Sequence, residues 1–283
     1  MTEIAKLKPS QFPALLREIP DPPKTLYLRG TLPPPETKLL TVVGSRRMSR
    51  YGKDACEHLI SGLAGYPIAI VSGLALGIDG VAHEAALEAG LPTIAVPGSG
   101  LSDEVLYPRA HFRLAQRILE NGGALLSEFE PEWKPRPESF PQRNRIMAGI
   151  SHAVLIIEAG LQSGTLITAR LATEYNRELL IVPHSIFAEG GAGGHLFARL
   201  GAAPVRGSDD ILMALGIEKT ETARDMALTD EEQKVIDILS EPTPRDELIR
   251  ALEMPISAAN VLLASMELRG LIAESLGEIR KAI

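Results

Sequence analysis

The sequence of 283 residues lacks several features that would assign a protein to a class at once. It contains one cysteine, Cys56, so an intrachain disulfide is impossible and a disulfide-stapled secreted fold is excluded. It has no uninterrupted run of about 18 apolar residues that could cross a bilayer. Its first residues, Met-Thr-Glu-Ile-Ala-Lys, have no signal-peptide pattern. These absences predict a cytoplasmic protein that does not enter a membrane.

Two familiar nucleotide-binding patterns are also missing. The first strand-like run is followed neither by the G-x-G-x-x-G fingerprint of dinucleotide-binding folds nor by the G-K-[ST] ending of a Walker A loop. His83 and Glu84 are adjacent in a helix-like segment, but no second acid, nucleophile or metal-ligand spacing accompanies them. We therefore expect no cofactor, no metal and no catalytic residue.

Basic residues are not in excess either. The formal net charge is −7, which argues against a nucleic-acid-binding protein. However, residues 217–283 hold 8 Lys and Arg against 14 Asp and Glu, whereas residues 1–216 hold 21 against 22. Phosphate binding depends on local clustering, because the Debye length is only about 8–10 Å at physiological salt. The larger, nearly neutral part of the chain can therefore still carry a cationic site.

The order of apolar segments predicts one large α/β domain. The first 38 residues hold eight prolines, which predicts an extended lead-in over 1–38 with an edge strand at Leu26–Gly30. Over 39–215, apolar runs alternate with helix-length segments. The runs are 39–44, 68–72, 93–97, 124–127, 153–158 and 179–183. This alternation is typical of a doubly wound, mainly parallel sheet that helices cover on both faces.

A second, smaller domain is predicted at 229–283, after a linker at 216–228. Residues 230–239, 245–252 and 257–269 have helical spacing, and 271–279 resembles a short hairpin, which is the order of a winged-helix module. Thr229 and Glu232 have the spacing of a capping box. The third helix is poor in basic residues and the module is acidic. We therefore expect a protein-interaction or structural role for this module rather than duplex-DNA reading.

Ligands of an open doubly wound sheet bind outside the carboxyl ends of its strands. Here those ends are rich in glycine. Residues 44–47, Gly-Ser-Arg-Arg, combine a turn that permits close backbone approach with two cations, and fit either a phosphate site or merely a tight turn. Residues 163–165, Ser-Gly-Thr, stand at a helix start and offer hydroxyls and backbone N–H groups to an anion.

The segment 139–150 places an aromatic residue and two arginines just before an apolar run. Guanidinium groups at Arg143 and Arg145 suit phosphate, and the ring of Phe140 offers a surface to a nucleobase or to the core. Taken alone, the segment is better explained by surface ion pairs and packing. Set among several glycine-bearing strand ends that outline a shallow anion site, it is better explained as a recognition loop that forms the cationic and aromatic wall beside that site.

Several separated motifs, in this order, resemble the DprA/Smf family, the DNA-processing proteins of bacterial recombination and natural transformation. The motifs lie at residues 42–46, 70–83, 93–96, 107–108, 126–128, 140–146 and 163–170. The resemblance extends over roughly residues 12–283. It implies an extended Rossmann-like domain that binds single-stranded DNA, forms a homodimer and helps to load RecA, without a chemical reaction. It also implies a C-terminal winged-helix-like domain.

Carried over residue by residue, the resemblance implies a DNA-binding pocket lined by three loops. The residues implied in this way are Ser45, Arg46, Phe140, Arg143, Asn144, Arg145, Ser163, Gly164 and Thr165, and we add Arg47 and Gly73 from the strand-end loops as further DNA-binding candidates. The chain departs from the family at His184, where the family usually has glycine, and at Gly193-Gly194-His195, where a Gly-Thr-Asn-like turn is usual. The two histidines could contact phosphate or fill space, and we favour the latter.

A second hypothesis comes from another functional class, the nucleotide hydrolases similar to LOG-type phosphoribohydrolases. Glu158 and Glu174 would then supply the acids, and residues 163–165 would clamp the phosphate. Such enzymes show a Pro-Gly-Gly-x-Gly-Thr loop, whereas residues 158–165 of this chain read Glu-Ala-Gly-Leu-Gln-Ser-Gly-Thr. The sequence therefore favours DNA binding over hydrolysis.

Overall fold

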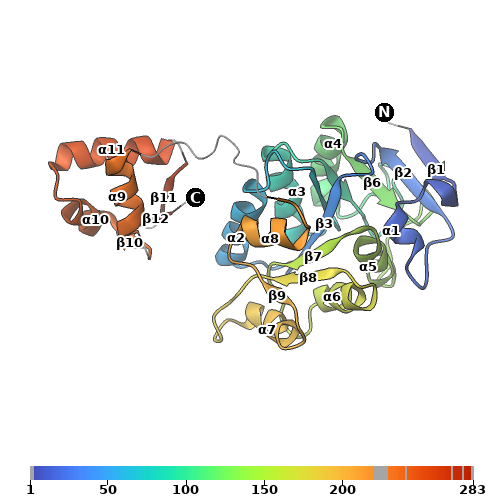
Figure 1. Cartoon of the computed structure of the whole chain (residues 1–283). Helices are drawn as coiled ribbons and strands as arrows, with labels where there is room; N and C mark the ends of the chain where they lie inside the picture. Colours follow the sequence, from blue (N-terminus) through green and yellow to red (C-terminus); the bar gives the residue numbers. More distant parts are fainter. Residues whose placement is uncertain (1–2, 219–228, 240, 269, 276, 282–283) are drawn as a thin grey trace. The chain divides into compact units, whose positions relative to one another are not determined.

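The computed structural model describes residues 3–218, 229–239, 241–268, 270–275 and 277–281. The chain divides into two compact units, Met1–Lys219 and Thr220–Ile283, and each is described by itself (Figure 1). The expected linker at 216–228 falls mostly on 219–228, which lie outside the described residues.

A nine-stranded sheet forms the centre of the first unit. Its strands are β1 (Ile4–Leu7), β2 (Leu26–Gly30), β3 (Lys38–Val43), β4 (Ile68–Ser72), β5 (Thr93–Ala95), β6 (Ala124–Ser127), β7 (Ala153–Ile156), β8 (Glu178–Ile181) and β9 (Ala203–Pro204). The order across the sheet is β1-β2-β6-β5-β4-β3-β7-β8-β9. From β6 to β9 all neighbours are parallel, whereas β1 and β2 are antiparallel additions at one edge.

Helices cover both faces of this sheet. They are α1 (Ala14–Arg17), α2 (Arg50–Ser61), α3 (Ile78–Glu88), α4 (Phe112–Glu120), α5 (Ser139–Ile150), α6 (Thr165–Glu174), α7 (Ala192–Ala198) and α8 (Ser208–Ala214), with short 3-10 turns at Pro9–Gln11, Arg109–His111 and Glu189–Gly191. One core contains side chains of α1, α5, α6 and α7, and another contains those of α2, α3 and α8. The mainly parallel doubly wound architecture predicted from the sequence is confirmed.

Strand β3 shows why its sequence has apolar residues on both faces. Leu39 and Val43 pack into the core under α5 and α6, while Leu40 and Val42 pack into the core under α2 and α3. Successive side chains of a strand point to opposite faces, so a strand that is buried on both faces has no polar alternation.

The chain reverses direction across the sheet between β3 and β7. After β3 it proceeds outward through β4, β5 and β6, and it then returns to β7, which pairs with the free edge of β3. In open α/β sheets a crevice forms outside the carboxyl ends of the two strands at such a switch point. Here those ends carry the loops that begin at Gly44 and Ile157.

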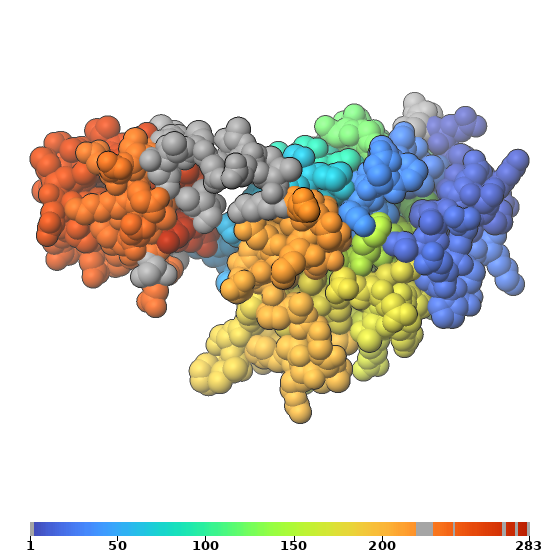
Figure 2. Space-filling model, viewed as in Figure 1, coloured from blue at the N-terminus to red at the C-terminus, as the bar shows by residue number. Residues whose placement is uncertain are grey.

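The N-terminal residues belong to the sheet. We expected an extended lead-in over 1–38 with an edge strand at Leu26–Gly30, but that strand, β2, lies inside the sheet. β1 pairs with its outer side, with Ile4 opposite Arg29, and β6 pairs with the other side. Ile-Ala-Lys-Leu at 4–7 is too short and too polar to indicate a strand from sequence. In Figure 2 the N-terminal part of the chain, in dark blue, and the part around α7 and α8, in orange, cover separate areas of the surface.

The second unit is a winged helix. It contains α9 (Asp230–Ile238), β10 (Thr243–Pro244), α10 (Arg245–Ala251), α11 (Ile256–Leu268), β11 (Ile272–Ser275) and β12 (Glu278–Lys281), with the sheet order β10-β12-β11. The predicted capping box is present, because the Thr229 hydroxyl accepts from the Glu232 N–H at 3.2 Å and the Glu232 carboxylate accepts from the Thr229 N–H at 2.9 Å. The two-residue strand β10 was not predicted.

Among the described residues, no single helix is long and apolar enough to cross a membrane. The pair α10 and α11, whose axes are bent by 117°, meets the length and composition requirements only when the two helices are taken together.

Candidate nucleic-acid interface

The loop after β3 is a tight turn that presents two arginines to solvent. The Ser45 hydroxyl accepts from the Arg47 N–H at 3.1 Å and donates to the Arg47 carbonyl at 2.8 Å. The Ser45 carbonyl in turn accepts from the N–H of Ile78 at 3.2 Å, at the start of α3. Gly77 has φ of +80°, and a Cβ on it would lie 2.2 Å from the Ser45 carbonyl oxygen. This close approach fixes the turn, while Arg46 and Arg47 remain exposed.

An aromatic wall stands beside this turn. The guanidinium carbon of Arg46 lies 5.1 Å from the ring centroid of Phe140, within cation–π range. The ring of Tyr107 lies 5.6 Å from the same ring on another side. Gly98 lies against Phe140, and a Cβ on Gly98 would lie 2.5 Å from the ring. The half-buried Phe140 ring is therefore held by a cation, a second aromatic and a glycine. Sequence reasoning had assigned no role to Gly98 or Tyr107.

The segment that carries Phe140 is a helix, not the recognition loop expected from sequence. It forms α5, in which Pro141 occupies the third position, where a proline is tolerated because the first-turn N–H groups have no intrahelical acceptor. Helical geometry also separates the two arginines. Residues two apart in a helix point in nearly opposite directions, so Arg143 and Arg145 cannot line one surface.

Arg143 lies beneath the surface. It is 4% exposed, and its Nη1 donates to the carbonyl of Val96 at 2.6 Å, at the end of β5. Its guanidinium also packs closely against Gly73, the first residue after β4, where a Cβ would lie 1.6 Å from Nη1. Arg143 therefore holds the carboxyl ends of two neighbouring strands together. Because a side chain would clash there, only glycine fits at position 73.

A buried carboxylate lies on the other side of Gly73. Asp79 Oδ2 accepts from the N–H of Gly73 at 3.1 Å and from the N–H of Ala75 at 3.3 Å. Burial raises the pKa of Asp79, while the Arg143 charge and these two N–H groups act in the opposite direction. Burial likewise lowers the pKa of Arg143 to about 10, and the Asp79 charge opposes that change. The two charges compensate each other within the protein.

Arg145 is directed away from the other candidates. Its guanidinium pairs with Glu128, at the end of β6, and lies 3.7 Å from the carboxylate of Asp21 in the N-terminal segment. Only 13% of its side chain is exposed. For Arg145 the structure therefore matches the simpler of the two sequence interpretations, an ion pair. These contacts connect α5 to the antiparallel edge of the sheet.

The start of α6 closes the other side of the crevice. The Thr165 hydroxyl donates to the carbonyl of Gly44 at 3.1 Å, and the Asn144 amide donates to the carbonyl of Gly164 at 3.5 Å. The Ser163 hydroxyl donates to Thr165 Oγ1 at 3.0 Å and accepts from the Thr165 N–H at 3.2 Å. The N–H groups and the hydroxyl protons of Ser163 and Thr165 all donate within the protein, so a ligand can receive a hydrogen bond from either hydroxyl only after that hydroxyl rotates away from its present acceptor.

These contacts connect the candidates in one continuous series at the switch point. It runs from Ser163–Thr165 through Gly44 to Arg46 and Phe140, with Arg143 and Gly73 beneath. The structure brings together Ser45, Arg46, Arg47, Gly73, Phe140, Arg143, Asn144, Ser163, Gly164 and Thr165, and leaves out Arg145. The arrangement can offer a cation, a ring and hydroxyls to one ligand.

Glu158, an acid of the hydrolase hypothesis, is engaged in a structural contact. Its Oε1 accepts from the Ser49 N–H at 2.8 Å and its Oε2 from the Ser49 hydroxyl at 2.5 Å, while that hydroxyl caps α2 by accepting from the N–H of Gly52 at 3.0 Å. Glu174 is the last residue of α6, nine positions after Thr165 and therefore about 13 Å further along the helix. The two carboxylates do not form an acid pair at one site.

The two histidines of the sixth loop pack against their surroundings. The His184 ring lies edge-on to Tyr51, with centroids 4.9 Å apart, and its Nδ1 lies 3.0 Å from the Val182 carbonyl. His195 Nε2 lies 3.0 Å from the carbonyl of His184. His184 Nε2 also lies 3.9 Å from Oε2 of Glu158. Both histidines therefore have polar contacts within the protein, and the expectation that they fill space stays a prediction. Among the described residues, no group of three or more His, Cys, Asp or Glu is placed to hold a metal ion.

Comparison with known proteins gives matches over both units. The family model of DNA recombination-mediator protein A matches residues 3–216, and that of the DprA winged helix domain matches residues 219–278. Protein Smf of Escherichia coli (strain K12) is 37% identical over 273 residues, which cover 93% of this chain and 72% of that protein.

Two solved structures resemble the first unit. The X-ray structure of DNA processing protein A from Streptococcus pneumoniae matches with a TM-score of 0.70 at 38% identity, over 77% of this chain and 76% of that chain. A structure of DNA processing protein A from Helicobacter pylori, which concerns the single-stranded DNA binding mode of that protein, matches with a TM-score of 0.67 at 30% identity. It covers 76% of this chain and 96% of that chain.

Proposed function

Because the chain belongs to the DNA recombination-mediator protein A family, we propose that it binds single-stranded DNA at the switch-point crevice and assists a RecA-type recombinase to load on the strand. The observation that carries the proposal is the position of Arg46, 5.1 Å from the Phe140 ring at the mouth of that crevice. A nucleotide presents a phosphate and a base together, and an adjacent cation and aromatic ring match both.

In this proposal Arg46 and Arg47 neutralise phosphates, and Phe140 stacks against a base. The hydroxyls of Ser163 and Thr165 supply hydrogen bonds to the backbone of the strand. Phosphate contacts carry no sequence information, and every base has a face that can stack. Weak sequence preference and strong salt dependence follow.

Arg143 has an indirect role in this proposal. Its guanidinium is buried and donates to Val96, so it positions the strand end that leads to Gly98, against which the Phe140 ring packs. We propose the same positioning role for Gly73, and we assign Arg145 to the fastening of α5. Both arginines had been expected to contact phosphate directly.

We also propose that the protein is not an enzyme. The support is the position of Glu158, whose two carboxylate oxygens both accept from Ser49. Release of free base from a nucleoside monophosphate, abolished in a Glu158→Gln variant, would contradict this proposal. The homodimer, the contact with a RecA-type recombinase and the cytoplasmic location are supported by family membership.

The crevice is tested by measuring the affinity for a labelled 20-residue oligo-dT over a range of salt concentrations. Arg46→Gln removes one phosphate contact. We expect the slope of log K against log salt to fall by about 0.7 and the affinity at 0.1 M salt to drop about fivefold, since counterion release is lost at one position. Phe140→Ala is expected to weaken binding by about 1–3 kcal/mol without changing the slope, because stacking involves no counterion.

Arg117→Gln is the matched control, since Arg117 is an exposed arginine near the end of α4, at the opposite edge of the sheet. It should leave both affinity and slope unchanged. Equal effects of Arg46→Gln and Arg117→Gln would show that the strand binds elsewhere.

A further inference from the structure

The helix that reads DNA in winged-helix proteins has an unusual surface in this chain. That helix, α11, contains no lysine or arginine over Ile256–Leu268. It exposes apolar side chains instead, with Ile256 70% and Val261 71% accessible. A surface that neutralises phosphate needs cations, and Ile256–Leu268 supplies none. This face is therefore suited to a ligand other than DNA.

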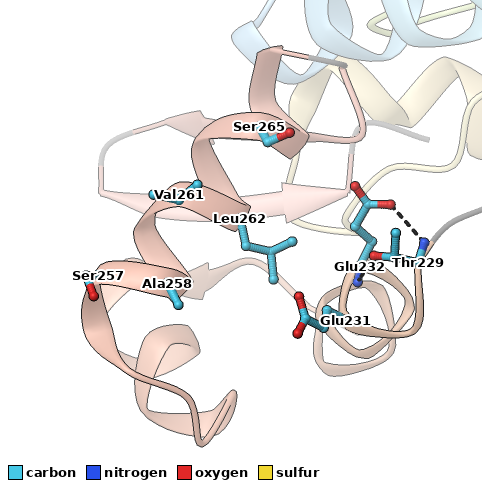
Figure 3. Close-up of a pocket in the computed structure, with 8 residues that line it drawn as sticks. All are labelled: Thr229, Glu231, Glu232, Ser257, Ala258, Val261, Leu262 and Ser265. Atoms are coloured by element: carbon cyan, nitrogen blue, oxygen red, sulfur yellow. Dashed lines mark hydrogen bonds between the residues drawn. The ribbon is translucent and has the colours of Figure 1, made fainter.

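A groove of about 580 Å³ lies between this face and the first turn of α9 (Figure 3). Its lining residues are Thr229, Glu231, Glu232, Ser257, Ala258, Val261, Leu262 and Ser265. The α11 side is mostly apolar, and Figure 3 shows Leu262 directed toward the α9 side. From Ala258 to Ser265 the groove follows two turns of α11, about 10 Å of helix.

The α9 side of the groove is acidic. Its first turn is Asp230, Glu231 and Glu232. The Glu232 carboxylate is engaged by the N–H of Thr229 at 2.9 Å, whereas Asp230 and Glu231 are exposed. Lys234, the cation of the same helix, donates to the carbonyl of Leu252 at 3.1 Å, at the end of α10. The charge that faces the groove is therefore negative, as is the charge of residues 217–283, which hold 14 acids against 8 bases.

We propose that this groove binds a basic amphipathic helix of a partner protein. The apolar stripe of such a helix, with anchors at i, i+3 or i+4, and i+7, would cover Val261 and Leu262, and its lysines or arginines would face Asp230 and Glu231. Charge complementarity favours a basic helix over the alternative ligands of the groove. A duplex or a second copy of this acidic unit would bring negative charge against the same acids. The inference concerns a different surface from the crevice of the proposed function and does not depend on it.

The probe is a labelled 18-residue peptide with leucine at helical spacing and lysine elsewhere, added to the full chain. Two control peptides accompany it. One has glutamate in place of lysine, and the other has the same leucines and lysines in scrambled order. We expect the lysine peptide to bind, with an affinity that falls as salt rises, and both controls to bind at least tenfold more weakly. Equal binding of all three peptides, or of none, overturns the proposal.

Two exposed substitutions locate the site. Val261→Ser removes apolar contact area and Glu231→Gln removes one rim charge. We expect Val261→Ser to weaken the lysine peptide at least fivefold at all salt concentrations, and Glu231→Gln to weaken it mainly at low salt. Met213→Ser, which alters an exposed apolar residue of α8 in the first unit, is the matched control and should change nothing. Peptide binding that is insensitive to Val261→Ser rejects the groove.

The same variants separate the other occupants. Self-association of the chain that Val261→Ser abolishes would assign the groove to a second copy. Duplex binding that Val261→Ser abolishes would assign it to DNA. A rise in peptide affinity when residues 219–228 are replaced by a Gly-Ser linker of equal length would assign it to this chain's own segment. The affinity for oligo-dT, measured in parallel, should be unchanged by Val261→Ser. Rejection of the groove would therefore not count against the proposed DNA binding at the crevice.

Discussion

Arg143 and Asp79 lie on either side of Gly73, at the end of β4, and both are buried. A guanidinium that lies beneath a binding surface acts through its charge and through the strands that it connects. Its partner matters equally, because a buried ion without compensation is strongly unfavourable. In the proposed site, Arg143 would therefore act without touching the ligand.

The pair gives a prediction about stability. Arg143→Met, which preserves volume and removes the charge, is expected to reduce the free energy of unfolding at pH 7 by about 3–5 kcal/mol, since Asp79 loses its compensating cation. Urea unfolding measures the loss. The double variant Arg143→Met, Asp79→Asn should recover a substantial part of it, because neither ion then remains buried.

The sign of the pH dependence follows from the raised pKa of Asp79. A carboxyl whose pKa is higher in the folded state binds its proton more tightly there, so its contribution to stability is fully present below about pH 3.9 and is lost as pH rises through the folded pKa. Removing Arg143 raises that pKa further. The loss caused by Arg143→Met, relative to the unchanged protein, should therefore grow between pH 4 and pH 7. A loss that is independent of pH would show that Asp79 is not the group that Arg143 compensates.

At the scale of elements, the strands were the most predictable part of the molecule. The apolar run at 68–72 and the run at 124–127 are strands β4 and β6 over those same residues. Strands buried on both faces are continuous apolar segments that end where the chain turns, so one local pattern determines both type and length. Gly44 and Gly73 directly follow β3 and β4, and for this reason the carboxyl edge of the sheet was predicted to hold the candidate site, which stays a prediction.

Helix α5 and strand β1 were not predictable in the same way. Pro141 and the polar run up to Arg145 suggest a loop, because nothing local shows that the segment packs on a sheet. The burial of Arg143 depends on Val96 and Gly73, which are 47 and 70 positions away in the sequence. Contacts of this range are set by topology, and no local pattern encodes them. Nine of the eleven candidate residues were implied by the family resemblance, and only the fold separates Arg145 from the others.

The start of α2 is held across the switch point, which gives a prediction for that helix. Ser49→Ala removes the acceptor for Gly52 and one donor to Glu158, so we expect a loss of about 1–2 kcal/mol in the free energy of unfolding. Ser49→Thr keeps the hydroxyl and should lose less than half as much. Thermal and urea unfolding measure both. Equal losses for alanine and threonine would indicate that the space at Ser49, rather than its hydroxyl, determines stability.

For the whole molecule, the uneven charge predicts how the second unit affects DNA binding. Residues 217–283 are net acidic and residues 1–216 are nearly neutral. A protein that ends at residue 218 should bind oligo-dT within twofold of the full chain at 0.15 M salt, where the Debye length is about 8 Å. At 0.01 M salt, where the Debye length is about 30 Å, the acidic second unit of the full chain repels the DNA over a longer distance. The shorter protein lacks that unit and should therefore bind several-fold more tightly. Loss of binding in the shorter protein would place DNA contacts in the second unit.

The return of the chain from β6 to β7 also has a consequence for biosynthesis. Gly44 and Thr165 are 121 positions apart, and the pairing of β7 with β3 requires residues 44–152 between the two strands to have been made. A growing chain that has emerged from the ribosome only as far as β6 presents the Arg46 turn but neither the α6 start nor the α5 ring beside it. If the proposed site binds the strand, incomplete chains that are still attached to the ribosome would lack the complete site.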